Sequence, residues 1–146
     1  MKYQYSDSVQ ITSHFNSTEF RCKCGKEHEF EVNNNLVQKL EQLYAALNCS
    51  KIIVTSGFRC SAHDKAVKGS GTGQHTRGKA ADICCYGQDG QPISSRTVCC
   101  KAQDTGFAGI ANITAAYIYT HVDVRSSGKW YGDEVHGNSS VTDDFY

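Results

Sequence analysis

Two short segments of the chain, far apart in the sequence, each place a histidine close to an aspartate. The first contains His75 and Asp82, and the second contains His121 and Asp123. Imidazoles and carboxylates that converge on one point form the open coordination shell of a catalytic zinc ion, in which water fills the remaining position. If both segments bind one metal ion, the fold must bring them together.

The first segment predicts a loop followed by a strand. His75 and Asp82 are too far apart to lie on adjacent turns of one helix, and Gly78 interrupts the segment between them. Residues 80–83 favour a strand that carries Asp82, and the small alanines beside it let neighbouring backbones approach closely. We therefore expect His75 on a loop and Asp82 on a strand.

The second segment, residues 116–125, has the alternation of a β-strand. A period of two places Tyr119, His121 and Asp123 on one face of this strand. A single histidine near an aspartate is more often a surface pair than a metal ligand. Two such motifs on separate segments make a shared zinc site, and hence a zinc hydrolase, the favoured interpretation.

These motifs and a third one resemble a known family. The strings are SGFRC at residues 56–60, GQHTRGKAADI at 73–83 and THVDVR at 120–125. In order and spacing they resemble the zinc D-Ala-D-Ala carboxypeptidase family of peptidoglycan peptidases. That family shares its fold with the hedgehog signalling domain and includes phage endolysins and L-Ala-D-Glu endopeptidases.

The resemblance extends over about residues 9–131. It is greatest for the branch whose distal motif is H-x-D-x-R followed by tryptophan, here His121, Asp123, Arg125 and Trp130. One departure is Gly73, which stands where the family usually has serine.

The expected fold is α+β, in a single peptidase-like domain over residues 1–146. Apolar side chains at helical spacing predict an amphipathic helix from Asn34 to Leu47, and Ile52–Thr55 is a β-branched strand. Further expected elements are helices over 7–15 and 94–103 and an antiparallel pair of strands over 109–114 and 116–125. We expect a small, mostly antiparallel sheet with helices against one side, a zinc cleft over the other, and a partly disordered tail at 137–146.

The resemblance implies that Zn²⁺ is the cofactor and that His75, Asp82 and His121 are its ligands. An alternative alignment makes Asp123 the third ligand and His121 its hydrogen-bond partner. Arg59 matches the family arginine that binds a substrate carboxylate or stabilises the oxyanion.

The group that handles the proton is less clear in the sequence. Several family members have a glutamate or aspartate three residues before the distal histidine, but Ile118 stands there. Asp123 is the nearest carboxylate, so we expect it either to take the proton or to hold the His121 imidazole. Glu134 and His136 are more distant candidates that only the folding of the C-terminal segment would bring near.

The predicted function is a zinc peptidase that hydrolyses a peptide bond in bacterial peptidoglycan. It would act on stem peptides as a D,D-carboxypeptidase or as an L-Ala-D-Glu-type endopeptidase, and a monomer is expected. The alternative is a non-catalytic module of the same fold that binds zinc and the cell wall. The two differ in whether the zinc-loaded protein releases new amino groups from peptidoglycan.

Composition argues against several other classes of protein. The 146 residues carry a formal net charge of zero, which gives no electrostatic case for binding nucleic acid or an anionic membrane surface. No apolar run is long enough to span a membrane, and the start MKYQYSDS lacks the apolar stretch of a signal peptide. We expect synthesis in the cytoplasm, and a phage or prophage lysis enzyme would reach the cell wall through a separate membrane pore.

Eight cysteines are many for a chain of this length. They allow disulfide bonds or buried thiols, and the missing signal peptide favours a reducing cytosol. Cys22 and Cys24 could instead form a structural zinc site with His28 and Cys60, although C-x-C is not the usual zinc-finger spacing. All three states of the cysteines remain open at this point.

Overall fold

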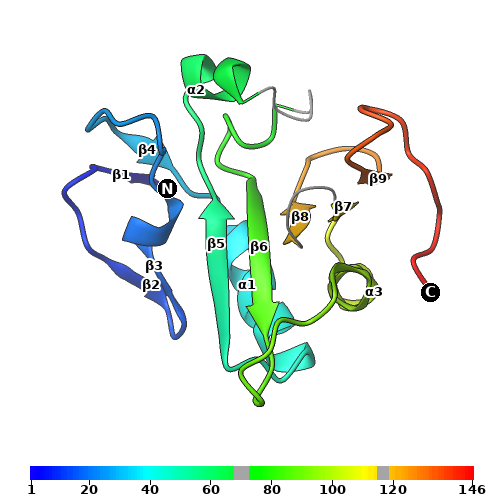
Figure 1. Ribbon diagram of the computed structural model, residues 1–146. Coiled ribbons are helices and arrows are strands. Elements are labelled where there is room, and N and C mark those ends of the chain that lie inside the picture. The colour runs from blue at the N-terminus through cyan, green and yellow to red at the C-terminus, as the bar shows by residue number, and fades with distance from the viewer. Residues whose placement is uncertain (68–72, 115–118) are drawn as a thin grey trace.

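The computed structural model describes residues 1–67, 73–114 and 119–146, and its central feature is a five-stranded sheet (Figure 1). The strand order is β5-β6-β8-β7-β9. All neighbouring strands are antiparallel except β7 and β9, which run parallel. The strands are β5 (Lys51–Ser56), β6 (Ala80–Tyr86), β7 (Gly109–Ile113), β8 (Tyr119–Asp123) and β9 (Trp130–Asp133).

Two helices, α1 (Asn34–Ala46) and α3 (Ser95–Thr105), pack against one face of this sheet. Each begins where its capping residue accepts backbone hydrogen bonds: Asn33 accepts from Asn35 and Leu36, and Ser94 accepts from Thr97. The helices predicted over 34–47 and 94–103 are therefore confirmed to within about two residues at each end.

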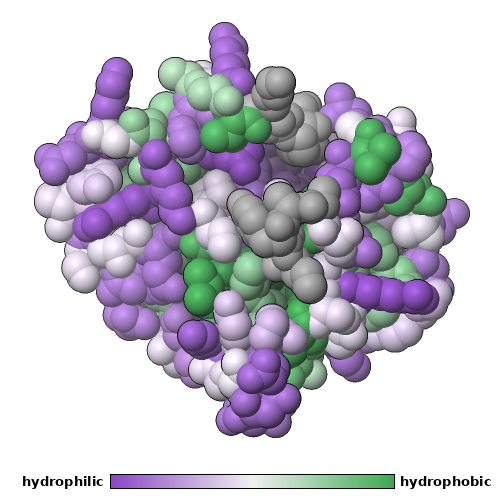
Figure 2. All heavy atoms as spheres, in the orientation of Figure 1, coloured by the Kyte–Doolittle hydropathy of each residue, from purple (hydrophilic) through white to green (hydrophobic). Residues whose placement is uncertain are grey.

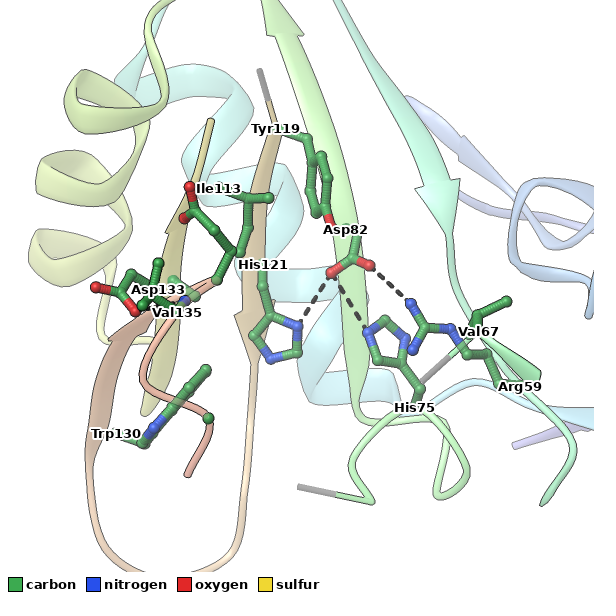
Figure 3. Close-up of a pocket in the computed structure, with 13 residues that line it drawn as sticks. Arg59, Val67, His75, Asp82, Ile113, Tyr119, His121, Trp130, Asp133 and Val135 are labelled. Atoms are coloured by element: carbon green, nitrogen blue, oxygen red, sulfur yellow. Dashed lines mark hydrogen bonds and ion pairs between the residues drawn. The ribbon is translucent and has the colours of Figure 1, made fainter. Parts of the chain in front are cut away.

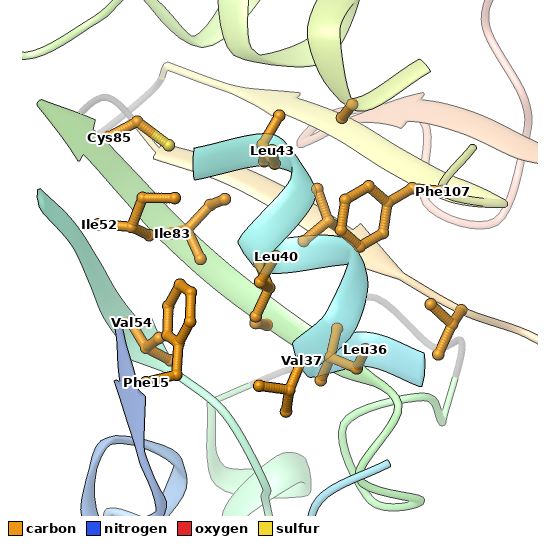
Figure 4. Packing of buried hydrophobic residues seen from close by; sticks show 14 of the residues in the cluster. Phe15, Leu36, Val37, Leu40, Leu43, Ile52, Val54, Ile83, Cys85 and Phe107 are labelled. Carbon is orange, nitrogen blue, oxygen red and sulfur yellow. The ribbon is translucent and has the colours of Figure 1, made fainter. Parts of the chain in front are cut away.

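The hydrophobic core lies between these helices and the sheet (Figure 4). The apolar side of α1 presents leucines and Val37 to the side chains of Ile52 and Ile83, which come from β5 and β6. Ile83 and Val122 are fully buried on this face, whereas Asp82 and His121, their neighbours in sequence, point to the other face because strand side chains alternate. The expected α+β architecture, with helices on one side of the sheet and the cleft on the other, is confirmed.

The N-terminal part forms two small ribbons beside the main sheet, shown in blue in Figure 1. β1 pairs with β4, and β2 pairs with β3, in both cases antiparallel. A 3-10 helix, η1, follows β3, and a second short helix, α2, follows β5. Their bounds are β1 (Lys2–Tyr3), β2 (Gln10–Thr12), β3 (Phe15–Asn16), η1 (Ser17–Phe20), β4 (Phe30–Glu31) and α2 (Ser61–Ala66).

The helix predicted over residues 7–15 is wrong, because these residues contribute to the β2–β3 hairpin. Ser17 closes this hairpin: its backbone N–H donates to the Val9 carbonyl at 2.8 Å, and its hydroxyl accepts from the Val9 N–H at 3.0 Å. Within residues 7–15, all of which are described, Phe15 is the one buried side chain. A helix here would have no apolar stripe to stabilise it.

The C-terminal segment contains a strand that the sequence analysis missed. No strand was predicted after residue 125, but β9 joins the sheet beside β7. The structure describes residues 137–146, for which disorder was expected, in contact with this strand. Val141 donates its N–H to the Tyr131 carbonyl at 2.7 Å, and the rings of Tyr131 and Phe145 lie 5.1 Å apart.

The face of the molecule in Figure 2 is mostly hydrophilic, with apolar side chains in small, separate patches. Among the described residues, no helix has the length and apolar character needed to cross a membrane.

Candidate metal centre

Three potential metal ligands meet on the sheet face opposite the helices (Figure 3). Asp82 in β6 and His121 in β8 are direct partners in the antiparallel register, and His75 lies on the loop that leads into β6. One ligand atom from each residue lies within 4.8 Å of the other two. The structure thus places His75 on a loop and Asp82 and His121 on strands, as expected, and brings all three together.

His75 is held in one orientation by the backbone. Its Nδ1 lies 2.7 Å from the Gly57 carbonyl oxygen, which can only accept, so Nδ1 must carry the proton. The lone pair of Nε2 then faces Asp82, whose Oδ1 is 3.4 Å away. The ring is almost completely buried, and this hydrogen bond fixes the tautomer that a metal ligand needs.

His121 has a carboxylate on each side of its ring. Its Nδ1 lies 3.0 Å from Asp82 Oδ1, and its Nε2 lies 2.8 Å from Asp123 Oδ2. Arg125 donates to both oxygens of Asp123, at 2.8 and 2.6 Å. The geometry therefore places Asp123, which is completely buried, behind the imidazole and turns Nδ1 towards His75 and Asp82.

Burial and neighbouring charges shift the pKa values of His121 and Asp82. Burial disfavours the imidazolium form of His121, but hydrogen bonds and charges from Asp123 and Asp82 outweigh burial and raise its pKa to about 9. Burial also opposes the charge of Asp82, yet His121 and His75 hold the pKa of this carboxyl well below its usual range. The two carboxylates thus stabilise positive charge at His121, and a divalent cation among these ligands satisfies the same requirement.

Arg59 reaches the site from the chain just beyond β5. Its Nη2 donates to Asp82 Oδ2 at 2.9 Å, its Nη1 to Asp64 Oδ1 at 3.1 Å, and its Nε to Ser56 Oγ at 2.9 Å. Because Arg59 holds Oδ2 of Asp82, the other oxygen, Oδ1, faces the two histidines. The guanidinium also lines the cleft, so it borders both the metal site and the space for a substrate.

The metal site opens into a cleft of about 310 Å³. Tyr119 and Trp130 form part of its wall, and the Trp130 ring meets the His121 ring edge to face at 5.7 Å. The cleft is lined by Arg59, Val67, His75, Asp82, Ala111, Ile113, Tyr119, His121, Trp130, Asp133, Glu134, Val135 and Gly137.

Glu134, a distant candidate in the sequence, lines this cleft. It follows β9, whose pairing with β7 brings it to the cleft, and its Oε1 accepts from the Thr114 backbone N–H and hydroxyl at 3.3 Å each. His136, the other distant candidate, contacts Asp133 instead. Ile118, the position where relatives carry a carboxylate, lies outside the described residues.

The candidate ligands lie in a part of the chain that matches a known protein family. A family model described as peptidase M15 matches residues 13–123. The chain belongs to the peptidase M15 family. The family relationship makes it a metallopeptidase, and the matched span includes Arg59, His75, Asp82, His121 and Asp123. No curated protein matches the chain.

The match to the M15 family ends before β9. Trp130 and Glu134 therefore belong to a part of the cleft that this peptidase builds outside the matched region.

The eight cysteines of this M15 peptidase all lie in the described part of the chain, and all are free thiols. Cys49, Cys85 and Cys99 are buried in the core, whereas three others, of which Cys22 is buried, gather in a second cluster that also contains a histidine.

Proposed function

We propose that the protein is a zinc-dependent peptidase that hydrolyses a peptide bond in the stem peptides of bacterial peptidoglycan. The observation that carries the proposal is the convergence of His75, Asp82 and His121 at one edge of an open cleft. Two imidazole nitrogens and one carboxylate oxygen are a ligand set typical of catalytic zinc, which keeps a fourth position open. Bound there, zinc supplies an activated water and polarises the scissile carbonyl.

Arg59 has two tasks in this proposal. Its contact with Asp82 Oδ2 positions the carboxylate ligand, and its place in the cleft wall supports recognition of a substrate carboxylate or of the developing oxyanion. A guanidinium suits both tasks because it carries several donors in a rigid plane. Stem peptides of peptidoglycan offer carboxylates near the bonds that such a peptidase cuts.

Asp123 acts through His121 in this proposal. Its carboxylate accepts a hydrogen bond from Nε2 of the imidazole and thereby keeps Nδ1 available for the metal. Proton transfer is then a task for a carboxylate that faces the cleft. We assign it to Glu134, because the neutral contacts from Thr114 hold it less firmly than the ion pairs hold Asp82 and Asp123. Asp133, the other carboxylate of the cleft wall, already accepts hydrogen bonds from the backbone of Val135 and from His136.

The type of bond cleaved and the biological role are proposed from the family resemblance. It supports either D,D-carboxypeptidase or L-Ala-D-Glu-type endopeptidase action by a monomer, and a role as a phage or prophage endolysin. The cleft shape, rather than the ligand set, distinguishes these activities.

The experiment compares the wild-type protein with His75→Ala. Loss of one ligand from an open three-ligand site should remove the metal from this site, so we expect about one zinc ion less per chain and no release of amino groups from peptidoglycan. Elemental analysis measures the zinc, and amine labelling measures cleavage. His14→Ala is the matched control, because His14 contacts Glu41 and Tyr44 away from the cleft.

Two results would contradict the proposal. Unchanged zinc content and cleavage in His75→Ala would place the active site elsewhere. A zinc-loaded wild-type protein that releases no amino groups from any peptidoglycan would instead support the non-catalytic, wall-binding module.

A further inference from the structure

A second group of metal-ligand side chains lies outside the cleft. Cys22, Cys24, His28 and Cys60 each place one ligand atom within 4.8 Å of the other three. The first three follow η1 in the N-terminal part, whereas Cys60 comes directly before α2. The fold therefore assembles this Cys22/Cys24/His28/Cys60 cluster from two segments that are distant in the sequence.

The distances within the cluster suit a tetrahedral metal site. Around a tetrahedral zinc with Zn–S bonds of about 2.3 Å, neighbouring ligand atoms lie roughly 3.5–3.8 Å apart. Cys24 Sγ and His28 Nε2 are 3.0 Å apart, and the 4.8 Å limit holds for every pair, so small side-chain adjustments reach this geometry.

The imidazole of His28 already has the tautomer that a metal ligand requires. Its Nδ1 lies 3.0 Å from the Glu29 carbonyl oxygen, which can only accept a hydrogen bond. The proton is therefore on Nδ1, and the Nε2 lone pair points towards Cys24. The same arrangement orients His75 in the catalytic site, where the Gly57 carbonyl is the acceptor.

Backbone donors point at two of the sulfur atoms. The Cys60 N–H donates to Cys22 Sγ at 3.3 Å, and the His63 N–H donates to Cys60 Sγ at 3.4 Å. Such N–H donors stabilise negative charge on sulfur, which is the form of cysteine that binds metal. A disulfide would use only two of the three cysteines and would leave the third beside His28.

We propose that Cys22, Cys24, His28 and Cys60 bind a second zinc ion whose role is structural. Three thiolates and one neutral imidazole are a complete ligand set for structural zinc, with no position left for water or substrate. The unusual C-x-C spacing is no obstacle, because Cys60 completes the site through the tertiary fold.

This second zinc ion would anchor the chain segment that supports the catalytic site. Gly57 packs so closely on the Phe20 backbone that a Cβ atom there would lie 2.8 Å from the Phe20 Cα. The Phe58 N–H donates to the Phe20 carbonyl at 3.0 Å, and the Gly57 carbonyl orients His75. Arg59 is the residue before Cys60, so the cluster fixes one end of the 57–60 segment, which contacts His75 and Asp82 through Gly57 and Arg59.

The test counts metal ions and identifies their ligands in the full chain. We expect about two zinc ions per wild-type chain and about one in either His75→Ala or Cys24→Ser, because each variant removes a ligand from one site. The double variant should bind none. Cys100→Ser is the matched control and should keep both ions, since Cys100 contacts the Phe145 carbonyl away from both sites.

Cobalt replaces zinc to give a spectroscopic readout that does not depend on activity. Thiolate-to-cobalt charge-transfer absorption should appear in His75→Ala and be missing from Cys24→Ser. If Cys24→Ser fails to fold, the cobalt titration of His75→Ala still tests whether the Cys22/Cys24/His28/Cys60 cluster binds metal, because the His75→Ala substitution leaves this cluster intact. Chelation should also lower the thermal stability of His75→Ala.

Either of two results would overturn the proposal. One is a His75→Ala protein that binds neither zinc nor cobalt through thiolates. The other is a mass, measured on protein purified under reducing conditions, that shows a disulfide between two of the three cysteines. Neither result bears on the catalytic site, whose test is the loss of cleavage in His75→Ala.

Discussion

At the scale of single residues, the surroundings of His121 orient its side chain within the proposed metal site. Each of its ring nitrogens faces a carboxylate, Asp82 on one side and Asp123 on the other. Arg125 neutralises Asp123 from behind, so the buried chain Arg125–Asp123–His121 holds the imidazole at a fixed angle. Of the two roles expected for Asp123 from the sequence, this position agrees with orientation of the imidazole.

Asp123→Asn should weaken the orientation of His121 without removing a metal ligand. In the metal-free protein, Asp123 and Asp82 raise the His121 pKa from 6.5 to about 9. The ion pairs of His121 with Asp123 and Asp82 therefore make their full contribution to the stability of the metal-free fold below pH 6.5. This contribution is lost as the pH rises through about 9. The asparagine carries no charge, so the variant should show a lower His121 pKa in an NMR titration and about 10- to 100-fold weaker activity or zinc affinity.

Glu134→Gln is the variant with which Asp123→Asn is compared, by the same measurements of activity, zinc content and His121 pKa. If Glu134 accepts the proton, its glutamine variant should lose turnover while the His121 pKa and zinc content stay at wild-type values. The reverse pattern, in which Asp123→Asn abolishes turnover with an unchanged His121 pKa and Glu134→Gln is fully active, would make Asp123 the general base.

Arg59→Lys tests the arginine that contacts Asp82. A lysine ammonium cannot reach Asp82, Asp64 and Ser56 at once as the guanidinium does, and it cannot make two parallel bonds to a substrate carboxylate. We expect activity to fall by about an order of magnitude or more when zinc is saturating. Steady-state kinetics measure the effect, with the exposed Arg77→Lys as control, and wild-type kinetics would leave Arg59 with no role in turnover.

At the scale of elements, the close packing of β7 on β8 positions the side chains of the proposed metal site. Gly109 in β7 lies opposite Asp123 in β8, and the Asp123 carboxylate occupies the space where a side chain at position 109 would project. The glycine is therefore required by a close approach between neighbouring strands. Through Asp123, this contact reaches the imidazole of His121.

Gly109→Ala should therefore disturb the site from outside the cleft. The added methyl group would overlap the Asp123 carboxylate, so either the strands separate or Asp123 moves away from His121. We expect a loss of stability of about 1–3 kcal/mol in chemical denaturation together with weaker zinc binding. In the control Gly87→Ala, the nearest atom is the flexible Asp89 carboxylate at 3.1 Å, and a Gly109→Ala protein that behaves like this control would contradict the strand-packing argument.

Across the whole molecule, the two faces of the sheet have different roles, because one packs the core and the other lines the cleft. One face is covered by α1 and α3 and contains the apolar core, whereas the other carries the proposed metal ligands and the cleft. The C-terminal segment forms part of the cleft wall: Trp130 lies against His121 and donates from its indole N–H to the Ser139 carbonyl at 3.2 Å. Residues 137–146 thus support a wall of the site from outside the sheet.

Local patterns in the sequence were enough to predict the elements that carry the ligands. Alternation in residues 119–123 and the small residues around Asp82 depend only on near neighbours in the chain, and so does the apolar spacing of α1. The helix predicted over residues 7–15 was wrong because local patterns do not show contacts with distant segments. Phe15 of the β2–β3 hairpin packs into a core that such segments form.

Residue types and local spacing were sufficient to name the candidate metal ligands and to predict His75 on a loop and Asp82 and His121 on strands. The folded structure was needed to find which imidazole nitrogen of each histidine faces the proposed metal site, that Asp123 lies behind His121, and that Glu134 reaches the cleft. It also joined Cys60 to the Cys22/Cys24/His28/Cys60 cluster. These features depend on hydrogen bonds and packing between segments far apart in the chain, and such contacts leave no periodic pattern along the sequence.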